Sequence, residues 1–212
     1  MIVVNFKTYS ESTGEKADSL AEKCSKARKE SGENVIIAPQ SPDLLRAKDK
    51  EIEVFGQHLD PVNPGSHTGH SLAKALKAAG ASGTLINHSE RRLKPEKIRK
   101  TIEKANEAGL TSIVCAQSPE ECEKFSEFDP DYVAFEPPEL IGGDVSVSEA
   151  KPELIEEAVE RSKVDLLTGA GVKTSQDVEK SMEIGCKGVL VASGVVKSED
   201  SYSAVMELCE GL

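Results

Sequence analysis

The sequence predicts an α/β fold in the form of a single-domain eight-stranded parallel (β/α)8 barrel. Short apolar runs alternate with amphipathic segments along the whole chain, and eight such runs can be counted. The runs lack a strict polar alternation, which is typical of parallel strands whose outer face is covered by helices. A chain of 212 residues also suits one such barrel, so we expect a single catalytic domain over residues 1–212.

An open doubly wound sheet is the structural alternative. It uses the same alternation of strands and helices, and the strand count favours the barrel only about two to one. No linker, low-complexity tract or repeat of solenoid type is visible in the sequence.

The first half of the chain carries four predicted strands, each rich in residues that favour extended structure. Pro39 ends the second strand, and Ser41-Pro42-Asp43 is a helix-start signal before a short apolar stripe. In order, we expect a strand at 2–6, a helix at 12–31, a strand at 35–38, a short helix before Lys50, a strand at 53–57, a helix at 71–79 and a strand at 84–87.

The second half repeats this pattern. Pro95 opens a helix that Gly109 closes, and Pro119 starts a helix of one to two turns. We expect helices at 94–109, from 118, at 152–162, at 175–184 and at 199–209, with strands at 111–115, 132–136, 164–167 and 188–192.

The composition argues against several classes of function. A formal net charge of −11 disfavours nucleic-acid binding, and no apolar run is long enough to cross a bilayer. The first residues carry no export signal, so we expect a cytoplasmic protein. Five cysteines without close paired spacing indicate reduced thiols that serve mainly in packing.

The segment 132–143 indicates a catalytic carboxylate. An apolar strand ends in Glu136, two prolines stop the strand, and Gly142 and Gly143 follow in a segment that could act as a hinged lid. Parallel α/β folds place reactive groups at the carboxyl ends of their strands. The alternative interpretation is an ordinary turn that carries a solvated Glu.

Asn5, Lys7 and His88 also stand at predicted strand ends. Asn5 and Lys7 lie two residues apart and share one side of a strand, so in a barrel they converge with His88 and Glu136 on one rim. Taken singly, each residue has a structural interpretation: a turn former, a surface cation and a hydrogen-bonded histidine, respectively.

Small-residue turns at the same end of later strands indicate an anion site. Gly169-Ala170-Gly171 follows the seventh predicted strand and Ala192-Ser193-Gly194 follows the eighth, where backbone amides can approach phosphate closely. Plain turn geometry is the alternative. Thr174 stands where a dinucleotide fingerprint needs its third glycine, so we expect no nicotinamide cofactor.

Together these motifs resemble those of the triosephosphate isomerase family, and they span nearly the whole chain. Gly169-Ala170-Gly171 and the short chain length resemble the compact archaeal branch, which leaves the helix lengths and the assembly open. The motifs are Asn5-Phe6-Lys7, Asn87-His88-Ser89-Glu90-Arg91-Arg92, the segment from Glu136 to Gly143, and Ala192-Ser193-Gly194.

The resemblance implies an isomerase of glycolysis and gluconeogenesis. The reaction interconverts dihydroxyacetone phosphate and D-glyceraldehyde 3-phosphate by proton transfer through an enediol(ate), without a metal or cofactor. By similarity Glu136 is the base, His88 the donor to the substrate oxygens, Lys7 the cation and Glu90 a second carboxylate. The implied substrate-binding residues are Asn5, Lys7, Ile141, Gly142, Gly171, Ala192 and Ser193.

The loop 58–70 resembles the family's interface loop. Its tip, Gly65-Ser66-His67-Thr68-Gly69, implies a contact in which Thr68 approaches the site of a neighbouring subunit. We therefore expect a homodimer or a homotetramer that acts on a small triose phosphate, with no nucleic-acid or membrane partner.

Two other functions stay open from the sequence. His58, His67, His70 and His88 fall within one third of the chain, with Asp60 near them, which could indicate the zinc or iron site of a metal-dependent sugar-phosphate epimerase barrel. The other is a barrel that binds phosphate without catalysis.

Overall fold

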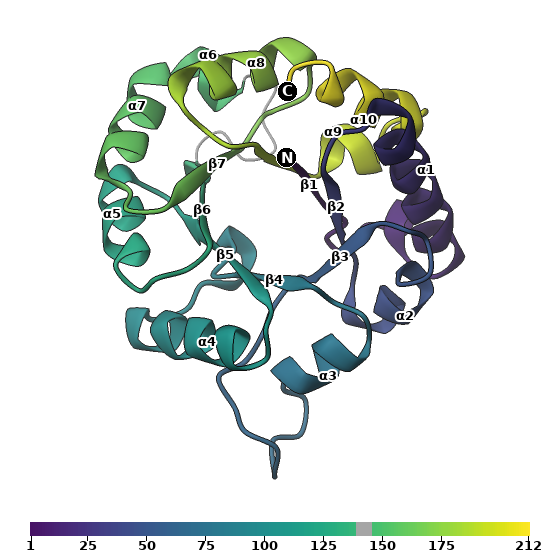
Figure 1. Cartoon of the computed structure of the whole chain (residues 1–212), viewed down its shortest axis with the longest axis vertical. Helices are drawn as coiled ribbons and strands as arrows, with labels where there is room; N and C mark the ends of the chain where they lie inside the picture. Colours follow the sequence, from purple (N-terminus) through teal and green to yellow (C-terminus); the bar gives the residue numbers. More distant parts are fainter. Residues whose placement is uncertain (139–145) are drawn as a thin grey trace.

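The computed structural model describes residues 1–138 and 146–212, and the side chains of 147 and 149 are not described. Eight parallel strands close into a barrel in chain order, with β1 paired to β8 (Figure 1). This confirms the barrel and excludes the open sheet. The strands are β1 Ile2–Asn5, β2 Val35–Ala38, β3 Glu53–Gly56, β4 Gly83–Ile86, β5 Thr111–Ala116, β6 Tyr132–Phe135, β7 Asp165–Gly169 and β8 Val189–Val191.

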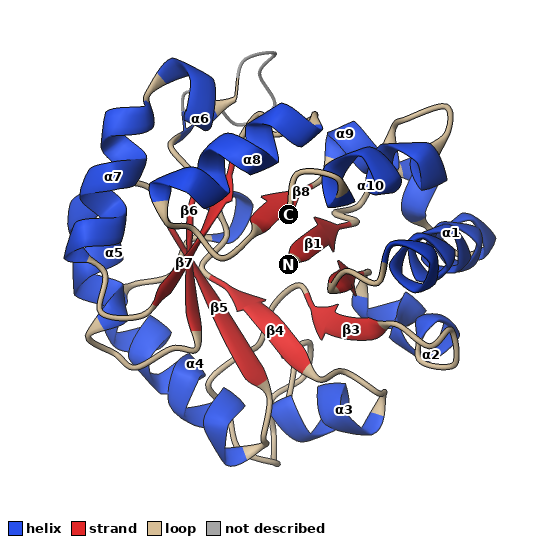
Figure 2. Cartoon of the chain, turned by 45° about the horizontal axis from the view of Figure 1, so that its top comes forward, coloured by secondary structure: helices blue, strands red, loops and turns tan. Residues whose placement is uncertain are grey.

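Helices surround the strands on the outside of the barrel (Figures 1 and 2). The α-helices are α1 Glu15–Ser31, α2 Leu44–Ala47, α3 Ala73–Ala78, α4 Pro95–Glu107, α5 Pro119–Ser126, α6 Val147–Ala150, α7 Pro152–Arg161, α8 Ser175–Ile184, α9 Ser193–Val196 and α10 Ser201–Cys209. The described residues also form three short 3-10 helices, η1 Ser10–Ser12, η2 Ser41–Asp43 and η3 Ser89–Arg91.

Local sequence signals set several helix ends. Thr174 and Asp177 form a capping box at the start of α8, where each side chain binds the other residue's backbone N–H. Gly32 and Gly185 end α1 and α8 in the left-handed conformation, which a residue without a Cβ adopts at little cost.

Both faces of the strands are buried, which explains why the sequence shows no polar alternation. Alternate residues point into the barrel or toward the helices. At Gly83 a Cβ would overlap the ring of Phe55, so this glycine makes room for an interior aromatic side chain. The interior layer consists of Val3, Ile36, Ala38, Phe55, Leu85, Ile113, Cys115, Ala134, Leu167 and Leu190.

Two predicted boundaries at the site end of the barrel are wrong. The strand β7 extends through Thr168 and Gly169, which pair with Val189 and Leu190 of β8 and do not form a turn. Ser193 and Gly194 open the short helix α9 and are not part of a simple turn. In both places the neighbouring backbone supplies partners that short-range sequence patterns do not reveal.

The segment between β3 and α3 projects from the barrel (Figure 1). Its base is closed by hydrogen bonds: the N–H of Asp60 donates to the carbonyl of Ser71 at 2.9 Å, and the N–H of Ser71 donates to Asp60 Oδ2 at 2.8 Å. His58 Nε2 lies 3.1 Å from Asp60 Oδ1. The tip, 63–70, is exposed.

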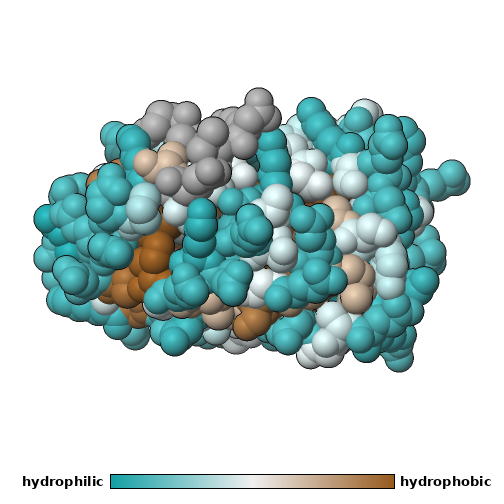
Figure 3. Space-filling view, turned by 90° about the horizontal axis from the view of Figure 1, so that it is seen from above, coloured by the Kyte–Doolittle hydropathy of each residue, from teal (hydrophilic) through white to brown (hydrophobic). Residues whose placement is uncertain are grey.

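The outer surface is mainly hydrophilic on the face shown in Figure 3. Within residues 1–138 and 146–212, no helix has both the length and the apolar character that a bilayer crossing requires.

Candidate active site

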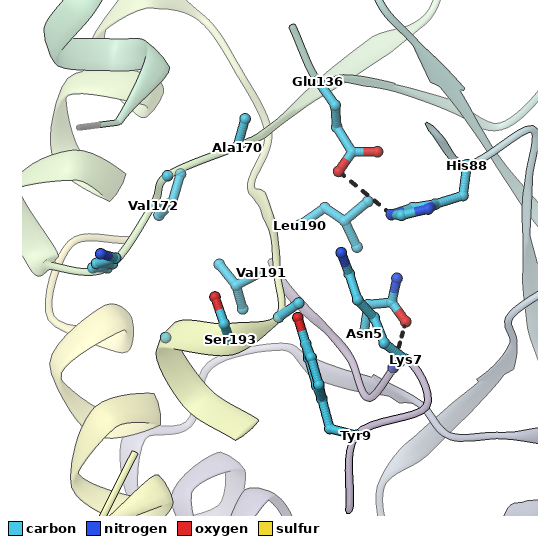
Figure 4. Close-up of a pocket in the computed structure, with 14 residues that line it drawn as sticks. Asn5, Lys7, Tyr9, His88, Glu136, Ala170, Val172, Leu190, Val191 and Ser193 are labelled. Carbon is cyan, nitrogen blue, oxygen red and sulfur yellow. Dashed lines mark hydrogen bonds and ion pairs between the residues drawn. The ribbon is translucent and has the colours of Figure 1, made fainter. Parts of the chain in front are cut away.

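A pocket opens at the carboxyl ends of the strands, between segments that follow β1, β4, β6, β7 and β8 (Figure 4). Seven of the catalytic and substrate-binding residues that the resemblance implies line it: Asn5, Lys7, His88, Glu136, Gly171, Ala192 and Ser193. The other lining residues are Tyr9, Ala170, Val172, Lys173, Leu190, Val191 and Gly194.

Glu136 directly follows β6 and is 5% exposed. Its N–H donates to the carbonyl of Ala116 at 2.8 Å, which fixes the backbone against β5. Its Oε2 is buried and has no hydrogen-bond partner in the described part of the chain. Burying a carboxylate oxygen without a partner is costly, so this group is placed for a purpose other than stability.

Gly169 provides the space that the Glu136 side chain occupies. A Cβ at position 169 would lie 2.5 Å from Glu136 Cγ and 2.9 Å from its Oε1. The sequence indicated Gly169 as part of an anion-binding turn, and the structure gives it this different role beside the carboxylate.

His88 faces Glu136 across the pocket, with Nε2 at 3.8 Å from Oε1. His88 caps η3, because the N–H of Glu90 donates to His88 Nδ1 at 3.2 Å. A ring nitrogen that accepts from a backbone N–H carries no proton, so neutral His88 holds its proton on Nε2. The imidazole therefore presents a donor to the pocket.

Asn87 fixes the position of His88. It adopts a positive φ of 63°, its Oδ1 accepts from the N–H of Leu93, and its Nδ2 donates to the carbonyl of Cys115, both at 2.8 Å. Asn tolerates the left-handed conformation better than most residues with a side chain.

Lys7 brings a positive charge into the pocket. Its side chain is 12% exposed, and its Nζ donates to Glu90 Oε1 at 3.0 Å. Asn5 holds the turn, since the N–H of Lys7 donates to Asn5 Oδ1 at 3.0 Å and Lys7 has a φ of 47°. Glu90, a predicted second carboxylate, is not among the residues that line the pocket; its side chain is 59% exposed, and its Oε2 is 3.6 Å from His88 Nδ1.

Gln57 is a positioning residue that the sequence did not indicate. Its Nε2 donates to the carbonyls of Lys7 and Ala38, each at 2.9 Å, and so ties the turn after β1 to the end of β2. The only sequence feature that could have identified Gln57 is its position as a polar residue directly after β3, and polar residues are common in loops.

The opposite side of the pocket is formed by the turn after β7 and by the start of α9. Ala170 and Gly171 have positive φ values of 73° and 75°, which turns the chain sharply after β7. Ala192 and Ser193 face them from the start of α9. Ile141 and Gly142 lie outside the described residues.

Cys115 is buried beside the carboxylate. Burial, followed by the negative charge of Glu136, raises the pKa of the Cys115 thiol well above its ordinary value. All five cysteines are buried and free, in agreement with the packing role expected from the sequence.

The four histidines do not gather in one place. His58 is adjacent to Asp60, His67 and His70 stack edge to face at 5.7 Å between ring centroids, and His88 faces Glu136. Among the residues that the structure describes, no three His, Cys, Asp or Glu side chains lie close enough to hold a metal ion.

A (β/α)8 barrel with a carboxylate and an imidazole facing each other over the strand ends is the architecture of an acid–base enzyme. A family model described as triosephosphate isomerase matches residues 1–211. The chain belongs to the triosephosphate isomerase family.

Curated relatives named triosephosphate isomerase support this assignment. That of Methanothermus fervidus is 46% identical, with 98% of this chain and 96% of the relative covered. That of Methanocaldococcus jannaschii is 44% identical, with 98% of both chains covered. That of Methanosarcina acetivorans is 43% identical, with 98% of this chain and 96% of the relative covered. The resemblance to the archaeal branch is thereby confirmed.

A crystal structure of triosephosphate isomerase from Bartonella henselae has the same fold. Its TM-score is 0.76 at 24% identity, and the match covers 99% of this chain and 97% of that one.

Proposed function

We propose that this protein is a triose-phosphate isomerase of glycolysis and gluconeogenesis, which interconverts dihydroxyacetone phosphate and D-glyceraldehyde 3-phosphate. The observation that carries the proposal is the pair formed by Glu136 and His88, 3.8 Å apart in a pocket that also contains Lys7. Family membership over the whole chain identifies the substrate.

In this reaction Glu136 removes a proton from the carbon beside the carbonyl and returns it to the neighbouring carbon. A single carboxylate can serve both carbons because they are adjacent. The unpartnered Oε2 supports this role, since it is not engaged by another described protein group.

His88 donates from Nε2 to the substrate oxygens as they gain negative charge in the enediolate. Its Nδ1 already accepts from a backbone N–H, which fixes the tautomer that this task requires. Lys7 supplies a positive charge near the same oxygens and the phosphate, Asn5 orients Lys7, and Glu90 binds the Lys7 ammonium before substrate enters.

We assign phosphate binding to the main chain of Gly171, Ala192 and Ser193, on the side of the pocket away from Glu90. Small residues let a phosphate oxygen approach backbone N–H groups closely. Ile141 and Gly142, which lie outside the described residues, are included in substrate binding on the resemblance alone.

The test is turnover of glyceraldehyde 3-phosphate by protein that has been freed of metal with a chelator. We expect isomerisation at an undiminished rate, because no step of the proposed reaction uses a metal. Loss of activity that returns with zinc or iron would favour the epimerase, and phosphate binding without turnover would favour a non-catalytic barrel.

We also propose that the protein acts in the cytoplasm as a homodimer or a homotetramer, with residues 1–212 as one catalytic domain. The projecting loop 58–70 supports the proposal, because its exposed tip extends away from its own barrel and is available to a second subunit.

A further inference from the structure

Tyr9 lines the pocket but has no part in the chemistry proposed above. It lies in the segment after β1 and is half-buried. In Figure 4 its ring rises along the pocket wall, and its hydroxyl points toward the space between Lys7 and Ser193. The sequence reasoning missed this residue, because Lys7 has a left-handed backbone and the simple alternation of strand side chains stops there.

Several contacts hold Tyr9 in this position. Its carbonyl oxygen accepts hydrogen bonds from the N–H of Ser12 at 3.1 Å, the hydroxyl of Ser12 at 3.2 Å and the hydroxyl of Thr13 at 2.8 Å. The ammonium of Lys197 lies 4.4 Å from the centroid of the ring, within the range of a cation–π interaction. Lys197 directly follows α9, so the ring is fixed to the element that begins with Ser193.

The Tyr9 hydroxyl is held in position, but no group in the described part of the protein uses it. It makes no hydrogen bond to any group in the described part of the chain. The hydroxyl of Tyr202, by contrast, donates to Glu30 on the outer surface. A positioned phenol that faces a polar pocket needs a partner, and that partner comes from the substrate or from water.

The charge of the molecule indicates which part of the substrate would bind the Tyr9 hydroxyl. A net charge of −11 repels a phosphate at long range, so the phosphate must be held by local donors. A phenol O–H is such a donor, and it faces the same end of the pocket as Ser193. Lys197, beneath the ring, adds positive potential at that end without entering the pocket.

We propose that Tyr9 is a substrate-binding residue whose hydroxyl donates a hydrogen bond to the phosphate group of the triose phosphate. This inference rests on the proposed function and adds a side-chain donor to the main-chain donors assigned there. It makes Tyr9 a determinant of the preference for phosphorylated over phosphate-free trioses.

The test is the Tyr9→Phe variant of the full-length protein, which removes the hydroxyl and keeps the ring over Lys197. The inhibition constant of inorganic phosphate should rise about three- to tenfold, the usual effect of losing one hydrogen bond. The value of kcat/KM for glyceraldehyde 3-phosphate should fall by a similar factor, with the change in KM rather than in kcat.

Tyr202→Phe is the matched control. Lys26 Nζ lies 4.5 Å from the centroid of the Tyr202 ring, so this tyrosine also has a cation–π partner, but it does not line the pocket. This variant should leave the phosphate inhibition constant unchanged. If wild-type protein isomerises the triose phosphate but Tyr9→Phe leaves that constant unchanged, the inference is wrong. A wild-type protein that fails to isomerise would instead overturn the proposed function.

Discussion

Glu136 and its neighbours show how single residues adapt this barrel to proton transfer. The carboxylate is buried, one oxygen lacks a partner among the described residues, and the imidazole opposite is too far away for a hydrogen bond. The unpartnered oxygen, Oε2, is available to a substrate proton.

The Glu136→Gln variant should retain phosphate binding and lose turnover by several orders of magnitude, because the amide keeps the shape but cannot accept the proton. Steady-state kinetics and the inhibition constant of inorganic phosphate measure the two effects separately. Turnover near the wild-type rate would show that another group is the base.

Gly169→Ala should displace Glu136, since the new Cβ would lie 2.5 Å from Glu136 Cγ. We expect kcat to fall roughly ten- to a hundredfold, because a small displacement of a catalytic group lowers the rate strongly. Gly109→Ala is the control, because Gly109 has a φ of 63° and open space around it. That change should lower the melting temperature and leave kcat intact. Equal kcat values for the two variants would contradict the assigned role of Gly169.

At the scale of elements, the loops after the strands carry the site, and a few side chains fix them. Gln57 joins the segments after β1 and β2, and Asn87 joins the segment after β4 to β5. The base of the segment after β3 is fixed by His58 and Asp60. Such links hold neighbouring loops at constant separation.

The link between His58 and Asp60 should make stability depend on pH. Burial lowers the pKa of His58; Asp60 opposes this, while Arg91 and His70 act with burial. The unfolded chain, with an ordinary histidine pKa near 6.5, then binds more protons than the folded one as pH falls below that value. The stability from neutral His58 is therefore present above about pH 6.5 and is lost at lower pH.

Urea unfolding from pH 5 to 8 measures this effect. The free energy of unfolding should decrease toward pH 5 in the wild type, and the decrease should be smaller in His58→Asn. His67→Asn is the control, since His67 is exposed at the tip of the same segment. An identical pH dependence in the wild type and in His58→Asn would exclude His58 as the cause.

At the scale of the whole molecule, closure of the sheet brings the ends of β1, β4, β6, β7 and β8 around one pocket. In the closed barrel the loop 58–70 projects outward (Figure 1), and in the proposed assembly it contacts a second subunit. The assembly and the active site therefore depend on loops at the same end of the barrel.

Replacing residues 62–70 by a short Gly-Ser link tests the proposed assembly. The link can close because Asp60 and Ser71 are already joined by backbone and side-chain hydrogen bonds. We expect sedimentation at nanomolar to micromolar concentration to give a monomer, with circular dichroism confirming that the barrel is folded. A variant that stays assembled at nanomolar concentration would place the interface elsewhere.

The sequence predicted the strand number, the order of the elements and the strand ends that carry Asn5, His88 and Glu136. These features follow from local periodicity and from breakers such as Pro39 and Pro137, which act over a few residues. The predictions that were wrong concern the end of β7 and the start of α9, where neighbouring strands and packing override local sequence patterns.

The sequence by itself determined which residues could act as base, donor and cation, because chemical type and strand-end position are local properties. The tertiary structure decided that Nε2 of His88 faces Glu136 and that Gly169 makes room for that carboxylate. It also decided that Gln57 ties the Lys7 turn to the end of β2 and that Tyr9 lines the pocket. These relations join residues far apart in the chain, and they exist only once the strands pair around a closed ring.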